Sequence, residues 1–500
     1  MKLNFNTYRD KVYACWIGKN IGGTMGTPYE GKREMLDIKG FVTEEGVILP
    51  NDDLDLQLVW LMAVERLGIK AIDEKMLGEF WMSYIGPNWN EYGIGKINMQ
   101  AGILPPLSGD CYNDWNNSNG AWIRTEIWAC LSPACPDIAM KYAYMDACVD
   151  HGNKEGTYAA MFISAIESAA FVISDLRKLI SLALSQIPET SRMAQSISKV
   201  LECYDSGMDY REAREVIRLM NADIGNGWFE APSNVSYAVI GLLWGEGDFK
   251  KSMIYAINCG DDTDCTAATV GSILGIMYGM EGIPKDWMQH IGDGIVTVSI
   301  KKGSTFPPYF PETCTELTDR VVKIAPSLPI VFRKNIAFTD GADEVSETEI
   351  EDMFAPERDK LSGYFFPWDD SHTKELMSRR PNSFTIDSAF LTVTVSFDGN
   401  PEIAPLGTQN VHLRLKNNCY DFGDIPYNLT FRWLGADGFT ISGPRFARLL
   451  NFTTHSDAIT ELDFHITAPE QIEAKNRLVL EIVAEGRPTV AYIPVLLLGI

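Results

Sequence analysis

The spacing of apolar residues changes once along the chain, near residue 385. From about residue 8 to 325, apolar residues recur at three- and four-residue intervals, which is the period of an amphipathic α-helix. Clear examples are LQLVWLMAVERLG (56–68), IAMKYAYMDACVDHG (138–152), TYAAMFISAIESAAFVIS (157–174) and FKKSMIYAINCG (249–260). Several of these segments are followed by or end in glycine, a common helix stop. The pattern predicts a large all-α domain over residues 1–325.

From residue 385 onward, apolar and polar residues alternate, which is typical of strands with one buried face. FLTVTVSFDG, NVHLRLKNN and RLVLEIVAEG show this period of two, and Gly, Asp or Asn ends each run. We therefore expect an Ig-like β-sandwich over residues 385–500. The intervening residues 326–384 contain the acidic stretch DGADEVSETEIEDMFAPERD and are predicted to form a connector. The expected fold class is multidomain α and β.

One segment of the helical region, CTAATVGSILGIMYGM (265–280), is apolar enough to suggest a membrane span. It has only 16 residues, whereas a span needs about 20. Gly271, Gly275 and Gly279 recur every fourth residue and so share one helical face. The segment is therefore predicted to be a central helix of a soluble domain, onto which neighbouring helices pack closely.

Composition narrows the class of protein further. A formal net charge of -24 argues against binding a nucleic-acid backbone by electrostatics. The first residues, MKLNFNTYRDKVYACWIGKN, lack the uninterrupted apolar core of a signal peptide. Ten cysteines occur without a CxxC pair, as expected of reduced, buried thiols. We expect a cytoplasmic protein that binds neither nucleic acid nor membrane.

Two aspartate-rich stretches each precede an apolar helix. They are Asn51-Asp52-Asp53-Leu54-Asp55 and Asp261-Asp262-Thr263-Asp264. Helix capping explains one or two aspartates at a helix start, but not three. If the two stretches met, each carboxylate pair at 4 Å would cost about 4 kcal/mol at an effective dielectric near 20. Protons or a hard divalent cation such as Mg²⁺ or Mn²⁺ would then neutralise them, and the residues alone leave capping and metal binding both open.

A family resemblance favours the metal. GDDTDCTAATVGSILGIMYG (260–279) resembles the GGDTDT signature and small-residue helix of the ADP-ribosylglycohydrolase family. Further stretches resemble that family in the same order along the chain, although the β region is not covered: WIGKNIGGTMGTPYEGK (16–32), PNDDLDLQLVWLMAVE (50–65), NGAWIRTEIWA (119–129), VDHGNKEGTYAA (149–160) and IPKDW (283–287). The resemblance implies an all-α domain with two Mg²⁺ (or Mn²⁺) ions between the two acidic motifs.

The same resemblance implies roles for individual residues. The implied metal-binding positions are Asn51, Asp52, Asp53, Asp262, Asp264 and Cys265. The implied catalytic residues are Glu30, in the loop near the scissile bond, with Asp53 and Asp262. The implied substrate-binding residues are Asn119, Gly120 and His151. Trp228 and Phe229 are expected to pack in the interior, with adenine stacking as the alternative.

The implied reaction is hydrolysis of an N- or O-glycosidic bond at ribose C1″ of an ADP-ribosylated protein or small molecule, which releases ADP-ribose. Departures from the family pattern lie near the metals: Asn51, Leu54 and Cys265 replace threonines, and Asp261 replaces a glycine. They predict that one metal site is weakened, altered or absent. The alternatives are hydrolysis of another ribosyl or N-glycoside and a catalytically silent ADP-ribose-binding protein. No motif in the β region indicates its partner.

Overall fold

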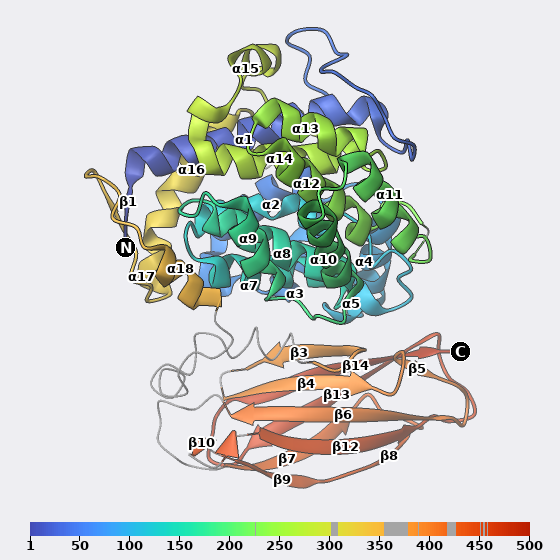
Figure 1. Ribbon diagram of the computed structural model, residues 1–500. Helices are drawn as coiled ribbons and strands as arrows, with labels where there is room; N and C mark the ends of the chain where they lie inside the picture. Colours follow the sequence, from blue (N-terminus) through green and yellow to red (C-terminus); the bar gives the residue numbers. More distant parts are fainter. Residues whose placement is uncertain are drawn as a thin grey trace. The chain divides into compact units, whose positions relative to one another are not determined.

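The chain forms two compact units in the computed structural model (Figure 1). Unit 1 comprises Met1–Lys96 and Tyr112–Ser371, and unit 2 comprises Ile97–Cys111 and His372–Ile500. The structure describes residues 1–225, 227–301, 309–354, 379–388, 390–417, 427–450, 452–453, 456–457 and 459–500. The predicted connector, 326–384, lies partly outside the described residues, at 355–378, so the predicted domain limits stay a prediction.

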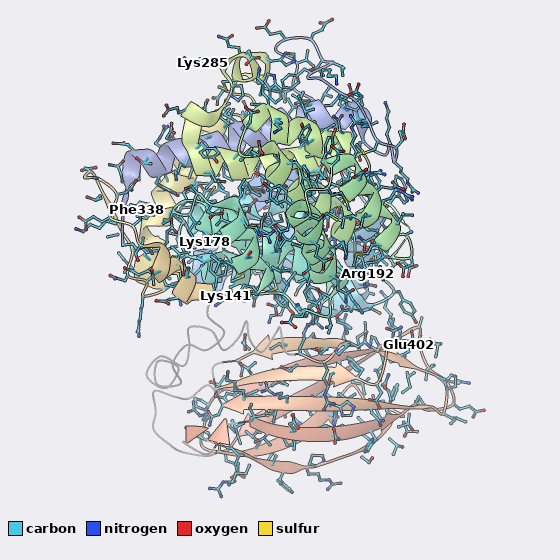
Figure 2. The ribbon with its side chains drawn as sticks, in the orientation of Figure 1. Lys141, Lys178, Arg192, Lys285, Phe338 and Glu402 are labelled. Carbon is cyan, nitrogen blue, oxygen red and sulfur yellow. The ribbon has the colours of Figure 1, made fainter. Side chains whose placement is uncertain are left out.

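Unit 1 is helical, as the period of its apolar residues predicts. Its helices are α1 (Phe5–Gly26), α2 (Asp52–Leu67), α3 (Glu74–Tyr84), α4 (Asn90–Ala101, which begins in this unit), α6 (Glu126–Leu131), α7 (Pro136–His151), α8 (Glu155–Ala169), α9 (Leu176–Leu184), α10 (Arg192–Asp205), α11 (Tyr210–Met220), α12 (Ala231–Gly245), α13 (Phe249–Asn258), α14 (Thr263–Tyr278), α15 (Lys285–Ile291), α16 (Cys314–Ile324), α17 (Leu328–Val331) and α18 (Glu347–Phe354). Short 3₁₀ turns join several of them. Charged side chains such as Lys178, Arg192 and Lys285 lie at its surface (Figure 2).

Two short strands are an addition to the expected all-α domain. β1 (Lys2–Asn4) pairs in parallel with β2 (Ala337–Thr339). With α17 and α18, this pairing places part of the predicted connector inside the helical unit. The sequence pattern did not reveal β1 because three residues are too few to show a period of two.

The close packing of α1 against α14 dominates the interior of unit 1 (Figure 1). Gly18 faces Gly271, and Gly22 faces Ala267, so closely that a Cβ atom on either glycine would overlap the opposing backbone. Because the glycines recur every fourth residue, they form one continuous contact face along each helix. The helices run antiparallel, which brings the end of α1 to the start of α14. The predicted central helix is confirmed.

Unit 2 is a β-rich C-terminal region with two five-stranded sheets. Their orders are β3-β4-β6-β12-β8 and β5-β14-β13-β7-β9, and β5 and β14 are the one parallel pair within these two sheets as described. The strands are β3 (Ser383–Asp387), β4 (Leu391–Phe397), β5 (Glu402–Ile403), β6 (Thr408–Asn417), β7 (Tyr427–Leu434), β8 (Thr440–Ser442), β9 (Phe446–Leu449), β12 (Ile459–Thr467), β13 (Lys475–Ala484) and β14 (Val490–Gly499), with a small hairpin of β10 (Phe452–Thr453) and β11 (Ser456–Asp457).

One hydrophobic cluster fills the interior of unit 2. It contains Val393 and Leu413 from the first sheet and Leu480 and Ile493 from the second. The segment 97–111, which includes α5 (Leu107–Asp110), also contributes to this cluster, although the sequence pattern places it in the helical domain. The apolar residues of this segment would show the same spacing whichever hydrophobic core they joined. The sequence therefore could not reveal that they pack in unit 2.

The described residues also test the expectations for the cysteines and for the apolar segment that resembles a membrane span. Nine of the ten cysteines are described, and all nine are buried and free. Cys419 lies outside the described residues. Among the described residues, no helix is both long and apolar enough to cross a membrane.

Candidate active site

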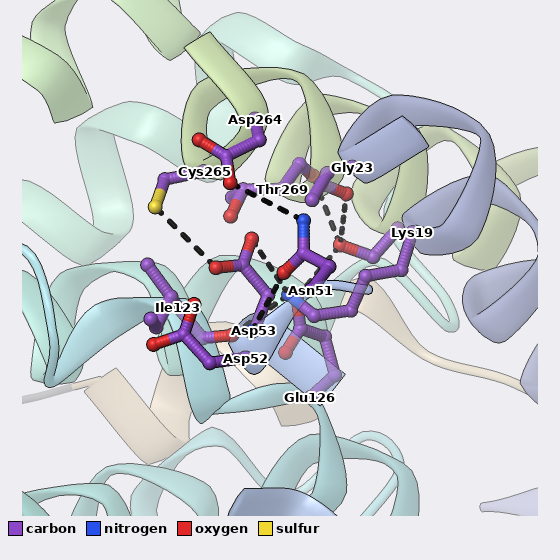
Figure 3. A network of polar contacts seen from close by, with 12 residues as sticks. Lys19, Gly23, Asn51, Asp52, Asp53, Ile123, Glu126, Asp264, Cys265 and Thr269 are labelled. Carbon is purple, nitrogen blue, oxygen red and sulfur yellow. Dashed lines mark hydrogen bonds and ion pairs between the residues drawn. The ribbon is translucent and has the colours of Figure 1, made fainter. Parts of the chain in front are cut away.

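The two aspartate-rich stretches meet at the starts of α2 and α14. Asn51 caps α2, since its Oδ1 accepts a hydrogen bond from Asp53 N at 2.7 Å, and its Nδ2 donates to Asp264 Oδ2 at 3.4 Å. Cys265 Sγ donates to Asp53 Oδ1 at 3.3 Å (Figure 3). Residues more than 200 positions apart thus share one site. The predicted convergence is confirmed, whereas the role of each residue stays a prediction.

Two groups of side chains in this site could hold a cation. One is Asp53, Asp264 and Cys265, and the other is Glu30, Asp262 and Asp264; within each group the ligand atoms lie within 4.8 Å of one another. Asp53 Oδ2, Asp262 Oδ1 and Asp264 Oδ1 are buried without a hydrogen-bond partner. A buried, unpartnered carboxylate oxygen is costly unless a proton or a cation neutralises it. The donor set therefore fits a divalent cation.

Burial raises the pKa of the carboxyl groups in this site. Burial and the charge of Asp264 raise the pKa of Asp262 well above its ordinary value of 3.8. Burial likewise raises the pKa of Asp53, although the positive charge of Lys19 opposes this shift. Partial burial and the charges of Asp264 and Asp52 raise the pKa of Glu30 to about 8. The raised pKa values have a common cause, the burial of several carboxyl groups close together.

Lys19 is a buried cation beneath this site that the sequence analysis missed. Its Nζ donates to Glu126 Oε1 at 2.6 Å and to Ile123 O at 2.7 Å, and it lies 3.9 Å from Asp53 Oδ2 (Figure 3). Burial lowers the pKa of Lys19, but the charges of Glu126 and Asp53 outweigh burial and raise it. A lysine inside the apolar, glycine-rich run CWIGKNIGG was the available signal.

Asp52 and Asp55 have different surroundings from Asp53. Asp52 Oδ2 accepts a hydrogen bond from Tyr92 at 2.9 Å and lies outside both cation-binding groups, although it lines the cavity described below. Asp55 Oδ2 accepts hydrogen bonds from Val298 N at 2.7 Å and from Ser299 Oγ at 2.9 Å. Asp55 thus anchors residues 298–299 beside the site.

The loop that carries Glu30 is held against the start of α14. Gly31 N donates to Asp261 O at 2.8 Å, and Asp261 N donates to Lys32 O at 2.6 Å. Asp261 has a φ of 69°, a left-handed conformation that Asp tolerates better than most residues other than glycine. This conformation explains how Asp261 can occupy a glycine position of the family signature while its side chain accepts a hydrogen bond from Phe229 N.

A cavity of about 590 Å³ opens beside the acidic site. Its lining includes Glu30, Asp52, Trp89, Asn119, Gly120, Phe229 and Asp262. Asn119 Nδ2 donates to Asp262 Oδ2 at 2.6 Å, and its Oδ1 accepts from Trp122 Nε1 at 3.0 Å. The structure therefore brings Asn119 and Gly120 to the same cavity as the aspartates.

His151 lies behind the cavity wall. It is fully buried; its Nε2 lies 3.1 Å from Ser118 Oγ and its Nδ1 lies 2.9 Å from Asp150 Oδ1. Ser118 lines the cavity, whereas His151 is not among the described lining residues. Arg124, also fully buried, donates to Asp150 Oδ1 at 2.8 Å and to the carbonyl of Gly120. The buried Arg124, Asp150 and His151 thus support the Ser118–Gly120 turn.

The aromatic side chains at and near the cavity are more exposed than the sequence analysis predicted. Trp228 and Phe229 stack with ring centroids 4.2 Å apart, but both are partly exposed, so the expectation that they pack in the interior is wrong. Phe229 lines the cavity, as does Trp89, which the sequence analysis missed and which is 47% exposed. An exposed tryptophan on a cavity wall offers a flat surface to a ring of a ligand.

Comparisons with known proteins agree with this arrangement. A family model described as ADP-ribosylglycohydrolase matches residues 4–323. ADP-ribosylhydrolase ARH3 of Mus musculus is 26% identical over 268 residues, which cover 47% of this chain and 71% of that protein. The protein of the same name from Homo sapiens is 23% identical over 321 residues, which cover 55% of this chain and 87% of that protein.

A solved structure described as an ADP-ribosylglycohydrolase-related protein complex has a TM-score of 0.42 and 16% sequence identity, and the alignment covers 64% of this chain and 99% of that chain. The family match spans more than half of the chain and contains both acidic motifs. The chain therefore belongs to the ADP-ribosylglycohydrolase family and is a hydrolase of glycosidic bonds.

Proposed function

We propose that this protein hydrolyses, with Mg²⁺ or Mn²⁺, the N- or O-glycosidic bond at ribose C1″ of an ADP-ribosylated protein or small molecule and releases ADP-ribose. One observation supports this proposal above the others. Two distant helix starts converge and leave Asp53 Oδ2, Asp262 Oδ1 and Asp264 Oδ1 buried without a hydrogen-bond partner, and Asp262 and Asp264 line a cavity. Such oxygens are the ligands that hard divalent cations prefer.

In this proposal, Asp53, Asp262 and Asp264 hold the cations, and Asp52, Asn51 and Cys265 complete their surroundings. When bound, two cations would polarise the ribose hydroxyls and a water molecule. The amide oxygen of Asn51 already accepts a hydrogen bond from Asp53 N, so Asn51 contributes by fixing the start of α2.

The chain's own groups supply proton transfer and orientation. Glu30, at the open side of the site, is the proposed base that takes a proton from the attacking water. The water oxygen bonds to C1″ as the bond from C1″ to the leaving nitrogen or oxygen breaks, and the protonated Glu30 then returns its proton to the leaving group. Asn119 orients Asp262, and the Ser118–Gly120 turn, supported by His151, holds the rest of the substrate.

The cavity and the relatives support the proposed substrate class. Its volume of about 590 Å³ suits a ligand of nucleotide size. Trp89 and Phe229 offer aromatic surfaces for a base. Relatives are described as an ADP-ribosylhydrolase and, over 54 residues at 39% identity, as an ADP-ribosylarginine hydrolase from Serratia proteamaculans. These descriptions support an ADP-ribosylated substrate.

Glu91 favours a second candidate, hydrolysis of a ribosyl N-glycoside without a diphosphate. Glu91 is 6% exposed, lines the cavity, and its Oε1 packs so closely on Gly120 that a Cβ atom there would overlap it. Its Oε2 is buried without a hydrogen-bond partner. A carboxylate at this turn would repel phosphate groups.

The test measures release of ADP-ribose from ADP-ribosyl-serine and ADP-ribosyl-arginine peptides by chelator-treated protein with Mg²⁺ or Mn²⁺ restored. We expect turnover that falls at least about 10²-fold in Asp262→Asn and Asp264→Asn. Asp286→Asn, a surface aspartate of α15, is the matched control and should keep full activity. Turnover of nucleosides alone would favour the second candidate, and no turnover of any of these substrates would contradict both.

Three broader proposals accompany this function. We propose that unit 2 is an Ig-like β-sandwich, because its two sheets share one buried cluster. We also propose the division into a catalytic domain at 1–325, a connector at 326–384 and a β domain at 385–500, with the insertion 97–111 packing in the β unit. Finally, we propose a cytoplasmic protein that does not bind membrane, because the nine described cysteines are free and buried. The net charge of -24 supports partners that do not include nucleic acid.

A further inference from the structure

The two groups that could hold a cation differ in their donor atoms. Glu30, Asp262 and Asp264 present only oxygen. Asp53, Asp264 and Cys265 present oxygen and sulfur, and these three side chains are 1%, 6% and 6% exposed. Asp264 belongs to both groups, so a single carboxylate joins an all-oxygen position to a mixed one.

The sulfur of Cys265 points into its group. Its Sγ lies 3.3 Å from Asp53 Oδ1, and the ligand atoms of all three side chains lie within 4.8 Å of one another. Asp53 Oδ2 and Asp264 Oδ1 are buried and without a hydrogen-bond partner. The cysteine is therefore one member of a three-donor arrangement with unsatisfied oxygens.

The surrounding charge also differs between the two positions. Lys19 Nζ lies 3.9 Å from Asp53 Oδ2, so an ammonium group adjoins the mixed position. A positive charge there repels any divalent cation, so the choice between cations depends on the donor atoms. Thiolate ligands, by contrast, select softer cations such as Zn²⁺, and Mg²⁺ prefers oxygen.

We propose that the two positions bind different classes of cation: the Asp53–Asp264–Cys265 position takes a thiophilic divalent cation such as Zn²⁺, and the Glu30–Asp262–Asp264 position takes Mg²⁺ or Mn²⁺. This inference rests on the proposed function, because it assumes that the acidic site holds cations. The Cys265 thiol donates to Asp53, and binding of a cation through the sulfur would release that proton to solvent.

Cobalt spectroscopy tests the proposal on the full chain without measuring activity. Chelator-treated protein is titrated with Co²⁺, whose bond to a thiolate gives a charge-transfer band in the near ultraviolet. We expect this band in the wild-type protein and its loss in Cys265→Ser. Cys203→Ser in α10 is the matched control, since Cys203 is also a buried free thiol at 4% exposure, and it should keep the band.

Calorimetric titration with Zn²⁺ and Mg²⁺ gives a second readout. In Cys265→Thr, which restores the family's hydroxyl, the preference for Zn²⁺ over Mg²⁺ should fall roughly tenfold or more. If the wild-type protein binds cations without a thiolate band, or if Cys265→Thr keeps the same preference, the inference is wrong and the proposed function survives. If the wild-type protein binds no divalent cation, both are wrong. The wild-type spectrum alone shows whether a thiolate binds the cation, even if a variant fails to fold.

Discussion

Gly18 of α1 and Gly271 of α14 pack backbone against backbone. A Cβ atom on Gly271 would lie closer than 3.0 Å to the carbonyl oxygen of Gly18. Because the two helices are antiparallel, this contact also fixes the end of α1, and hence the loop that carries Glu30, relative to the start of α14. The glycine contact face of α1 and α14 therefore contributes to the stability of unit 1 and also fixes the positions of its site residues.

Gly271→Ala should destabilise unit 1 by about 1–3 kcal/mol, because the added methyl group must push two well-packed helices apart. Chemical denaturation followed by circular dichroism measures the change. Gly40→Ala is the control: nothing lies within 4 Å of a Cβ atom at Gly40, and its free energy of unfolding should change little. Equal effects of the two substitutions would contradict this account of the helix contact.

Lys19→Met should destabilise the protein by about 3–5 kcal/mol, because it leaves the buried carboxylate of Glu126 without its cation. Adding Glu126→Gln should restore part of that loss, since the amide can be buried without a charge. The matched control is Lys250→Met, which removes an exposed ion pair with Asp286 and should cost about 1 kcal/mol or less. Comparable losses in both lysine variants would show that burial of the Lys19 pair is not the cause.

Tyr92→Phe should weaken cation binding roughly tenfold, because it removes the hydrogen bond at 2.9 Å that orients Asp52. Its effect on the free energy of unfolding should be small, since the ring remains packed edge-on against Trp81. Calorimetric titration with Mn²⁺ measures the affinity, and thermal unfolding controls for stability. Unchanged affinity would remove Asp52 from the surroundings of the cations.

The stability of unit 2 should depend on pH through His412, whose imidazole lies between two carboxylates. Its Nδ1 lies 2.6 Å from Asp463 Oδ1 and its Nε2 lies 3.0 Å from Asp398 Oδ1, and these hydrogen bonds raise the pKa of His412 above 6.5. The stability that protonated His412 contributes is fully present below pH 6.5 and is lost as the pH rises through its raised pKa.

Hydrogen exchange measures this effect strand by strand. Protection of β6 and β12, corrected for intrinsic exchange rates, should fall as the pH rises above 6.5 and through the raised pKa of His412 in the wild-type protein. His412→Gln should show a flat profile over the same range. His465→Gln, at a histidine of the neighbouring strand β12, is the control and should behave as the wild-type protein does. A fall of equal size in His412→Gln would assign the pH dependence to other groups.

Much of the site was predictable because its signals are local. Asp52, Asp53, Asp262 and Asp264 stand at helix starts, and the order of motifs along the chain resembles one family throughout. Lys19, Tyr92 and Trp89 were not predictable in this way. Each acts on the site from an element that reaches it only through packing. The sequence around Tyr92 and Trp89 is compatible with an ordinary buried or surface residue, and Lys19 has one local signal, its position in an apolar, glycine-rich run.

The sequence by itself determined the type of each long element, the glycine face of α14 and the two acidic helix starts, because periodicity and capping depend on neighbours within a few positions. Tertiary structure alone decided that Asn51 turns its amide nitrogen toward Asp264, that His151 lies behind Ser118, and that residues 97–111 join the β-rich unit. These outcomes depend on contacts between residues far apart in the chain. Many side chains together determine each such contact, so no short stretch of sequence predicts it.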